Sequence, residues 1–208
     1  MTTQFPPSDF DYWAATYDRS TVGDTGFPFD GYYRVLQIVV DLAGVAPGAD
    51  LLDLGTGTGN LALLFTRKGC GIWGIDFSSE MLALAKLKLP GAELACLDIR
   101  SEWPEAFQRR YNFIVSAYTF HHFPLEEKVA LVRRLLEKYL HPGGNLVIGD
   151  IAFQDTAAED LLRCLLGEEW EQEYYWLADE SLAAFTAAGI PATYTQVSSC
   201  AGVFHFHG

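Results

Sequence analysis

The residues with the clearest chemical pattern lie in one short glycine-rich stretch, residues 51–60. An apolar run leads to Asp53, and glycines then recur at every second position, as Gly55, Gly57 and Gly59. Glycine tolerates a positive φ and lets a ligand approach the backbone without meeting a Cβ atom. After the last glycine the apolar residues take helical spacing, and the free N–H groups of that helix would face the turn. The pattern predicts a strand, a tight turn and a helix that together bind a nucleotide-like ligand.

The spacing of these glycines differs from that of two well-known phosphate-binding loops. The dinucleotide fingerprint is G-x-G-x-x-G and the P-loop is G-x-x-x-x-G-K-[ST], whereas this chain has Gly55-x-Gly57-x-Gly59. Phosphoryl transfer through a P-loop therefore has no support. A nicotinamide oxidoreductase stays as a rival hypothesis, although it needs the third glycine one position later.

Acidic residues end the next two predicted strands. Asp76 closes the segment 71–76, about 20 residues after the turn, where a carboxylate can accept hydrogen bonds from both ribose hydroxyls. Asp98 follows the segment 92–97 and could accept from an exocyclic amine at the far end of the same ligand. Either acid alone could be a solvated strand end or a helix cap, but two beside a glycine turn favour a ligand site.

The elements that must position these residues follow the order of a doubly wound α/β domain. Between the apolar runs lie segments of helical spacing, such as 33–42 and 125–140, and two β-rich segments at the end could pair antiparallel. The predicted strands are 50–54, 71–76, 92–97, 112–118, 145–149, 192–198 and 202–206.

Ligands of such sheets bind outside the carboxyl ends of the parallel strands. This rule makes the residues at the strand ends the first candidates for a site. The residues expected to gather on one rim are Gly55, Asp76, Asp98, Tyr118 and Asp150.

Length and composition fit a single domain over residues 1–208, and the net charge of −13 argues against a nucleic-acid substrate. The beginning of the chain lacks a signal-peptide pattern, and no apolar run is long enough to span a bilayer. The four cysteines are widely separated, without a C-x-x-C pair. We therefore expect reduced thiols in a cytoplasmic protein, with no membrane partner.

Residues 1–34 carry many aromatic side chains outside the regular pattern of the sheet. A short helix is expected over residues 9–17, and a loop over residues 19–30, which contain two glycines and a proline. We interpret this segment as an aromatic lid over a pocket. The alternative is an N-terminal arm that simply packs on the core.

The motif Asp53-x-Gly55-x-Gly57-x-Gly59, with Asp76 and Asp98, resembles the motifs of class I S-adenosylmethionine-dependent methyltransferases. The resemblance covers the chain from about Trp13 to its end. It includes His141-Pro142-Gly143-Gly144, which is similar to the segment that usually precedes the fifth strand in this family. The segments that resemble the bacterial YrrT-like group within that family are 13–18, 57–61, 116–122 and 173–175.

This resemblance implies a Rossmann-like methyltransferase fold, a mostly parallel seven-stranded sheet with an antiparallel terminal pair. It also implies S-adenosylmethionine as cofactor and methyl transfer to a small-molecule acceptor, which the motifs leave unidentified. A non-catalytic sensor or partner protein that binds the same cofactor is the alternative outside enzymes.

The resemblance also implies roles for individual residues. The glycine turn would pass beneath the amino-acid portion of the cofactor, with Asp53 supporting it, and Asp76 would hold the ribose. Asp98 and the backbone of Ile99 would read the adenine, while tyrosines of the N-terminal arm would cover the methionyl end. The expected cofactor-binding residues are Tyr17, Tyr33, Asp53, Gly55, Thr56, Gly57, Gly59, Asn60, Asp76, Phe77, Asp98, Ile99, Ser116 and Tyr118.

A base is needed only if the acceptor must lose a proton. His121 and His122, directly beyond the fourth strand, are the catalytic candidates because an unperturbed histidine titrates near neutral pH. Adjacent side chains point in different directions, so one of them could instead cap the next helix or bond to the sheet.

Two further groups of residues have both a functional and a structural interpretation. The aromatic run 174–176 follows an acidic segment and could form a wall of the acceptor pocket that suits a cationic or planar molecule, or only an internal aromatic patch. His205 and His207 share one face of a terminal strand but have no evident third ligand, so we expect no metal site.

Overall fold

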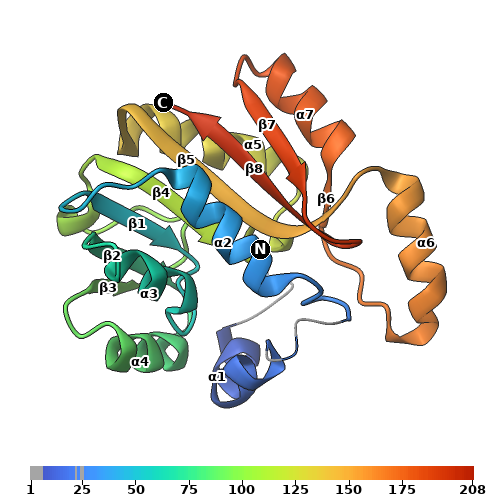
Figure 1. The fold of residues 1–208 in the computed structure, drawn as a ribbon, viewed down its shortest axis with the longest axis horizontal. Helices are drawn as coiled ribbons and strands as arrows, with labels where there is room; N and C mark the ends of the chain where they lie inside the picture. Colours follow the sequence, from blue (N-terminus) through green and yellow to red (C-terminus); the bar gives the residue numbers. More distant parts are fainter. Residues whose placement is uncertain (1–6, 22, 24–25) are drawn as a thin grey trace.

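The computed structural model describes residues 7–21, 23 and 26–208, and a mostly parallel sheet dominates them (Figure 1). Its strand order is β3-β2-β1-β4-β5-β8-β7, with the short β6 paired to β5. The strands are β1 (Asp50–Leu54), β2 (Gly71–Asp76), β3 (Glu93–Cys96), β4 (Tyr111–Ala117), β5 (Leu140–Phe153), β6 (Trp176–Leu177), β7 (Ala192–Gln196) and β8 (Ala201–His207).

The pairing confirms the predicted fold class. β1 to β5 run parallel to one another, whereas β8 is antiparallel to both β5 and β7. The α-helices are α1 (Pro7–Ser20), α2 (Tyr32–Ala43), α3 (Asn60–Thr66), α4 (Ser79–Lys88), α5 (Leu125–Arg134), α6 (Thr156–Leu166) and α7 (Ala178–Ala187).

Helices cover both faces of the sheet, and successive strand residues alternate between two apolar cores. Leu51 and Val115 face the core built with α2 and α3, while their neighbours Leu52 and Ile114 face the core built with α5 and α7. Figure 1 shows α2 in front of the sheet and α5 behind it. This double coverage explains why the parallel strands are nearly continuous apolar runs in the sequence.

Local signals in the sequence define the helix ends that border the site. The Ser78 side chain accepts a hydrogen bond from the Met81 N–H and so caps α4, which ends near Lys86 and Lys88. Asp155 caps α6 in the same way, through the N–H of Ala158.

The strand that differs most from its predicted bounds is β5. β5 begins at Leu140, which pairs with Tyr111 of β4, and it continues to Phe153 because β8 and β6 extend its pairing beyond the predicted segment 145–149. Asp150 therefore lies inside β5 and is fully buried. The prediction that the fifth strand ends at Asp150 is wrong.

Short helical segments complete the chain: a 3₁₀ turn η1 (Glu105–Phe107), a 3₁₀ turn η2 (Phe120–His122), a π-helical turn η3 (Leu135–Tyr139) and a 3₁₀ turn η4 (Gly167–Glu169). In the described part of the chain, none of the helices has both the length and the apolar character needed to cross a bilayer.

Candidate functional site

A cavity of about 620 Å³ opens where β1, β2 and β4 end. The strand order reverses between β1 and β4, and open α/β sheets bind ligands at such a switch point. Gly55, Gly57 and Asp76 line the cavity from the β1 and β2 ends, whereas His121 and His122 line it from the turn after β4. One space thus contains some of the predicted cofactor residues together with both predicted catalytic residues.

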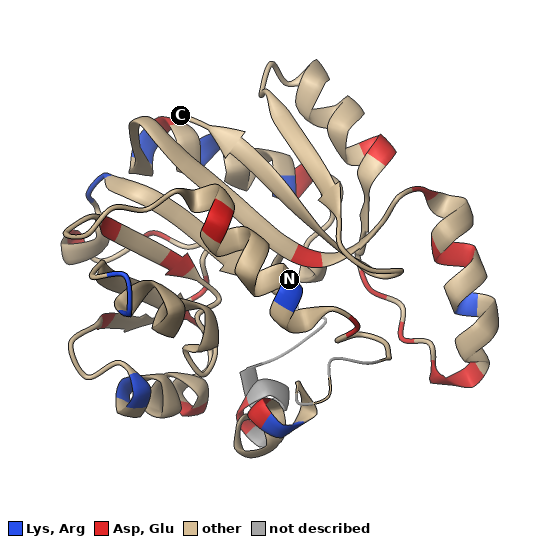
Figure 2. Cartoon of the chain, viewed as in Figure 1, with Lys and Arg blue, Asp and Glu red and all other residues tan. Residues whose placement is uncertain are grey.

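The walls of this cavity are aromatic and acidic. Among its described lining residues there is no lysine or arginine, so its charge is negative. Figure 2 shows the acidic residues that follow one another along α6 and the segment after it. The aromatic and acidic lining residues are Tyr17, Phe27, Phe29, Phe77, Tyr118, Tyr175, Asp76, Glu169, Glu171 and Glu173.

The glycine turn has no room for a side chain at its first position. Gly55 has φ of 68°, and a Cβ atom there would lie 1.9 Å from the hydroxyl oxygen of Thr119. The turn is held to β2 by the Gly55 and Thr56 N–H groups, which both donate to the Ile75 carbonyl. Glycine at this position therefore lets β1 continue closely past the residues that follow β4.

Asp76 connects the turn to the start of α4. Its carboxylate accepts from the Gly57 N–H at 2.7 Å and from the Ser78 N–H at 2.9 Å, and it lines the cavity. Burial raises its pKa, against the opposing effect of these hydrogen bonds.

Asp53 lies deeper, in β1. Its carboxylate is buried and makes no hydrogen bond of ordinary geometry with the described residues. Burial, followed by the nearby Asp76 carboxylate, raises the pKa of Asp53 to about 8. Asp53 also lines a second, small cavity under the turn, together with Thr56 and Asn60.

We expect Asp53 to make the folded protein less stable as pH rises. An unfolded aspartate loses its proton near pH 3.9, whereas the folded one keeps it to about pH 8. Between these pH values the folded protein holds the Asp53 proton and the unfolded protein does not. Each rise in pH therefore favours the unfolded state, and the free energy of unfolding falls by at most about 1.4 kcal/mol per pH unit. Asp53→Asn cannot ionise and should flatten this dependence in urea unfolding between pH 5 and 8. The exposed variant Asp41→Asn should keep the wild-type slope, and equal slopes in all three proteins would contradict the prediction.

Several predicted cofactor residues lie outside the main cavity. Asp98 pairs with Arg100 at 2.6 Å, and although burial opposes it, this pairing lowers the pKa of Asp98. Ile99 packs in the core behind the sheet, and its carbonyl accepts from the Trp103 indole. Ser116 is buried and donates to the Leu54 carbonyl at 2.7 Å. Their contact with an adenine stays a prediction.

The N-terminal arm is predicted to line the site with Tyr17 and Tyr33, and only the first of these does so. Tyr17 lines both cavities, but Tyr33 is 51% exposed and lines neither. Its neighbour Tyr32 takes the inward position, where it accepts from the Asn60 amide at 3.3 Å. Successive helix residues point about 100° apart, and the sequence did not show which of the pair faces inward.

Tyr118 lines the cavity and packs against other aromatic side chains. In the described chain it is the non-glycine residue with a positive φ, 53°, and its backbone N–H donates to the Gly149 carbonyl. Its ring lies 5.1 Å from that of Tyr32 and 5.8 Å from that of Phe29. Strained residues of this kind often occur at ligand sites, where packing fixes them.

An ion-pair network ties α1 to the glycine turn. Asp18 accepts from Thr58 at 2.6 Å, from Asn60 at 3.1 Å and from Lys88 at 2.6 Å. These contacts lower the pKa of Asp18, although burial opposes them. The Asp11 side chain accepts in the same way from Ser78.

The two histidines have different surroundings. His121 is buried, with its Nδ1 atom 2.6 Å from the Asp150 carboxylate, which also accepts from the His121 backbone N–H. An ionised carboxylate only accepts, so Nδ1 carries the proton and Nε2 is the ring atom directed elsewhere. Burial alone would lower the pKa of His121, but the Asp150 charge raises it. The Asp150 pKa is lowered by the same partner against its burial.

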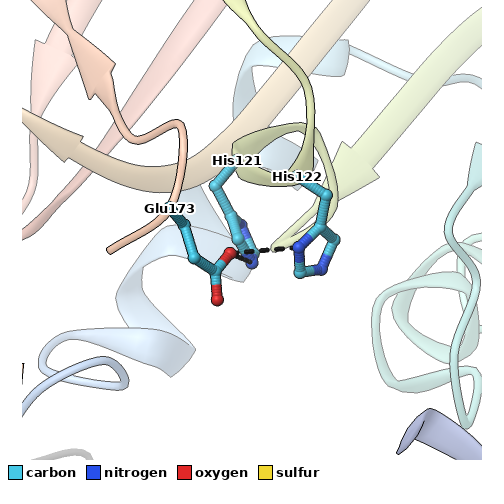
Figure 3. Close-up of side chains that lie close together, drawn as sticks. All are labelled: His121, His122 and Glu173. Carbon is cyan, nitrogen blue, oxygen red and sulfur yellow. Dashed lines mark ion pairs between the residues drawn. The ribbon is translucent and has the colours of Figure 1, made fainter. Parts of the chain in front are cut away.

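Glu173 joins the two imidazoles from a distant segment. Its Oε2 atom lies 3.0 Å from His122 Nδ1 and 3.5 Å from His121 Nε2. Figure 3 shows the three side chains converging, the histidines from η2 and Glu173 from the segment before β6. Burial and then the neighbouring His121 lower the pKa of His122.

A second layer holds this cluster in place. Asp150 also accepts from the Trp176 indole at 2.9 Å, and Lys128 lies 4.2 Å above the Trp176 ring. Lys128 donates to the Tyr174 carbonyl, while the Tyr174 N–H donates to the His121 carbonyl at 3.0 Å. Burial lowers the pKa of Lys128 to about 7.

Sequence reasoning missed four of these contributors. The sequence predicts Asp150 at a strand end, and it predicts only that Lys128 lies within a helix. Asp18 and Glu173 were noted inside motifs but received no partner, because the contacts span 40 residues or more along the chain. No local pattern indicates such pairings.

Comparison with known proteins gives matches over most of the chain. Residues 51–144 match a family model described as a methyltransferase domain. The chain is 33% identical to an uncharacterized methyltransferase of Geobacillus kaustophilus, over 90% of this chain and 89% of the relative. It is 34% identical to the uncharacterized methyltransferase YrrT of Bacillus subtilis, over 90% of each chain.

Solved structures of lower identity share the fold. The DhpI–SAM–HEP complex has a TM-score of 0.75 at 19% identity and covers 97% of this chain and 95% of its own. The magnesium protoporphyrin IX methyltransferase ChlM of Synechocystis, with bound SAH, has a TM-score of 0.67 at 18% identity, over 97% and 98% of the chains.

Proposed function

Because the chain belongs to the YrrT-like family of methyltransferases, we propose that it methylates a small molecule held in the 620 Å³ cavity. S-adenosylmethionine is the methyl donor, as in the SAM and SAH complexes of proteins with this fold. The observation that carries the proposal is that the glycine turn and the His121–His122–Glu173 cluster line one cavity. The donor and the acceptor would meet there.

The donor would lie across the ends of β1 and β2. Gly55 and Gly57 would pass beneath its amino-acid portion, and Asp76 would accept from the ribose hydroxyls. The raised pKa values of Asp53 and Asp76 fit a cationic ligand, whose positive charge favours ionised carboxylates. The Asp98 position is supported only by its place after β3, with its side chain turned to Arg100.

The acceptor would lie on the β4 side of the donor. Methyl transfer is an in-line displacement in which the sulfonium loses its charge, so the main task is to hold the nucleophile at attack distance in a dry site. The aromatic wall would exclude water, and His121 and His122 would face the space left for the acceptor. The described lining of this cavity has four carboxylates and no lysine or arginine, which favours an uncharged or cationic acceptor over an anion.

The N-terminal arm, residues 1–34, would act as a lid on one methyltransferase domain that spans residues 1–208. What supports this is the docking of α1 on the glycine turn and α4 through Asp18 and Asp11. The donor would then enter and leave when these contacts open. A cytoplasmic location agrees with four free cysteines, two of them exposed.

Asp18→Asn should loosen this lid. The amide keeps the shape but loses the charge that attracts Lys88, so we expect faster hydrogen exchange in α1 and severalfold faster release of S-adenosylmethionine. The neutral variant of its exposed neighbour, Arg19→Gln, is the control. Unchanged hydrogen exchange and donor release in Asp18→Asn would show that the ion pair does not control access to the site.

A labelled-methyl transfer screen tests the proposed function. The enzyme is incubated with methyl-labelled S-adenosylmethionine and a metabolite extract, and small molecules are then separated from polymers. We expect the label in a small molecule that is uncharged or cationic. Label found only in protein or nucleic acid, or in no species above an enzyme-free control, would refute the proposal.

A further inference from the structure

We propose that His121, His122 and Glu173 form a binding site for one divalent transition-metal ion. Each residue offers one ligand atom, and these atoms lie within 4.8 Å of one another. Zinc-to-ligand distances in proteins are about 2.0–2.2 Å for imidazole and carboxylate, which puts neighbouring ligand atoms roughly 3–3.5 Å apart. The Glu173 Oε2 atom already lies 3.0 Å and 3.5 Å from the two ring nitrogens.

The surroundings of His121 are those of a metal-bound histidine. Such a histidine almost always donates its other ring N–H to a carboxylate or carbonyl, which fixes its tautomer and orientation. Asp150 supplies that carboxylate at 2.6 Å from Nδ1 and leaves Nε2 directed at Glu173. Asp150 is itself fixed by the Trp176 indole and the Ile151 N–H, both at 2.9 Å.

The charges around the cluster favour a bound cation. Two carboxylates, Asp150 and Glu173, lie within reach of His121, with side-chain exposures of 0% and 12%. The nearby Lys128 is directed to the Tyr174 carbonyl and the face of Trp176, so it is not inserted between the three ligand atoms. A dication between the rings would balance both carboxylates.

The donor set indicates the class of ion. Two imidazoles and one carboxylate suit zinc, iron(II), cobalt or nickel, whereas magnesium and calcium prefer oxygen ligands. Three protein ligands also leave a coordination position open, as in catalytic zinc sites. Because all three residues line the cavity, that position would face the acceptor.

The open coordination position indicates the chemical class of the acceptor. This inference rests on the proposed function. A hydroxyl or thiol bound at the open position would lose its proton to solvent, since a bound metal lowers the pKa of its ligand. The resulting anion would attack the methyl carbon. The carbon–sulfur bond of the sulfonium breaks, a carbon–oxygen or carbon–sulfur bond forms, and the donor leaves as a neutral thioether.

Cobalt(II) tests the site without knowledge of the acceptor. Chelator-treated protein is titrated with cobalt(II), and visible ligand-field absorption and bound metal per chain are measured. We expect one ion per chain, with affinity lowered at least tenfold in Glu173→Gln and His122→Ala. Asp150→Asn should weaken binding by about 10–100-fold, the usual effect of losing a carboxylate that orients a ligand.

The control is the surface pair His205 and His207, whose rings lie 4.1 Å apart and which could bind metal adventitiously. His205→Ala/His207→Ala should keep the absorption and the stoichiometry, and circular dichroism checks that every variant is folded. No cobalt bound to the wild type, or binding lost only in the surface double variant, overturns the metal site. Full methyl transfer by chelator-treated enzyme would overturn the metal's role in acceptor activation and leave the proposed function standing.

Discussion

His121→Ala is expected to slow methyl transfer by about 10²–10⁴-fold while S-adenosylmethionine still binds. The imidazole is buried against Asp150 and lines the cavity from the turn after β4, whereas the glycine turn follows β1 and Asp76 ends β2. The loss should therefore appear in turnover at saturating donor. It is measured as labelled product per enzyme, with donor affinity determined separately by calorimetry.

The effect on folding must be separated from the effect on chemistry. Removal of the ring leaves the Asp150 carboxylate with fewer donors in a buried place, which costs about 1–3 kcal/mol of stability. Assays are therefore run well below the unfolding temperature, which circular dichroism gives for each variant. His205→Ala, on the far strand β8, is the matched control and should keep wild-type turnover. Full turnover by folded His121→Ala would remove this residue from the mechanism.

Gly55→Ala is expected to lower the affinity for S-adenosylmethionine by more than tenfold. A Cβ atom at this position would overlap the Thr119 side chain, with three atoms at 1.9 to 2.7 Å, so the turn or the segment after β4 must move. The positive φ adds strain of about 1–2 kcal/mol, and overpacking typically adds about 1–3 kcal/mol. Calorimetric titration and urea unfolding measure the two effects.

Gly48→Ala is the control that separates the effect of backbone strain from the effect of steric overlap with Thr119. Gly48 has a φ of 83°, and a Cβ atom there would meet nothing within 4 Å. We expect this variant to be destabilised only by the backbone strain and to bind the donor as the wild type does. Equal stability and equal donor affinity of the Gly48 and Gly55 variants would show that the close approach of Thr119 does not matter.

Much of the fold could be predicted because its signals are local. The glycine turn and the apolar strands before and after it are defined by residues near one another in the sequence, and their positions are confirmed. The terminal antiparallel pair was predicted for the same reason. β5 was predicted too short because its continuation depends on pairing with β8, a partner about 50 residues away.

The site was predicted less completely than the fold. Gly55, Gly57, Asp76, His121 and His122 do line one cavity, since the ends of parallel strands meet on one rim. The ion pairs that hold them come from Asp18, Asp150 and Glu173 and depend on how distant segments pack. Tyr33 is predicted to line the site and Tyr32 is not, although nothing in the sequence distinguishes their faces of α2.

Titration of S-adenosylmethionine into the wild type and Asp76→Asn tests the central claim, that the donor binds across the glycine turn and Asp76. Asparagine keeps the shape of the side chain but loses the charge that would bind the ribose hydroxyls, a loss of about 1.5–3 kcal/mol. We expect one donor per chain in the wild type, affinity lowered by about 10–100-fold in Asp76→Asn, and no response to NADH. Equal donor affinity in both proteins, or tight NADH binding with no response to S-adenosylmethionine, would contradict it.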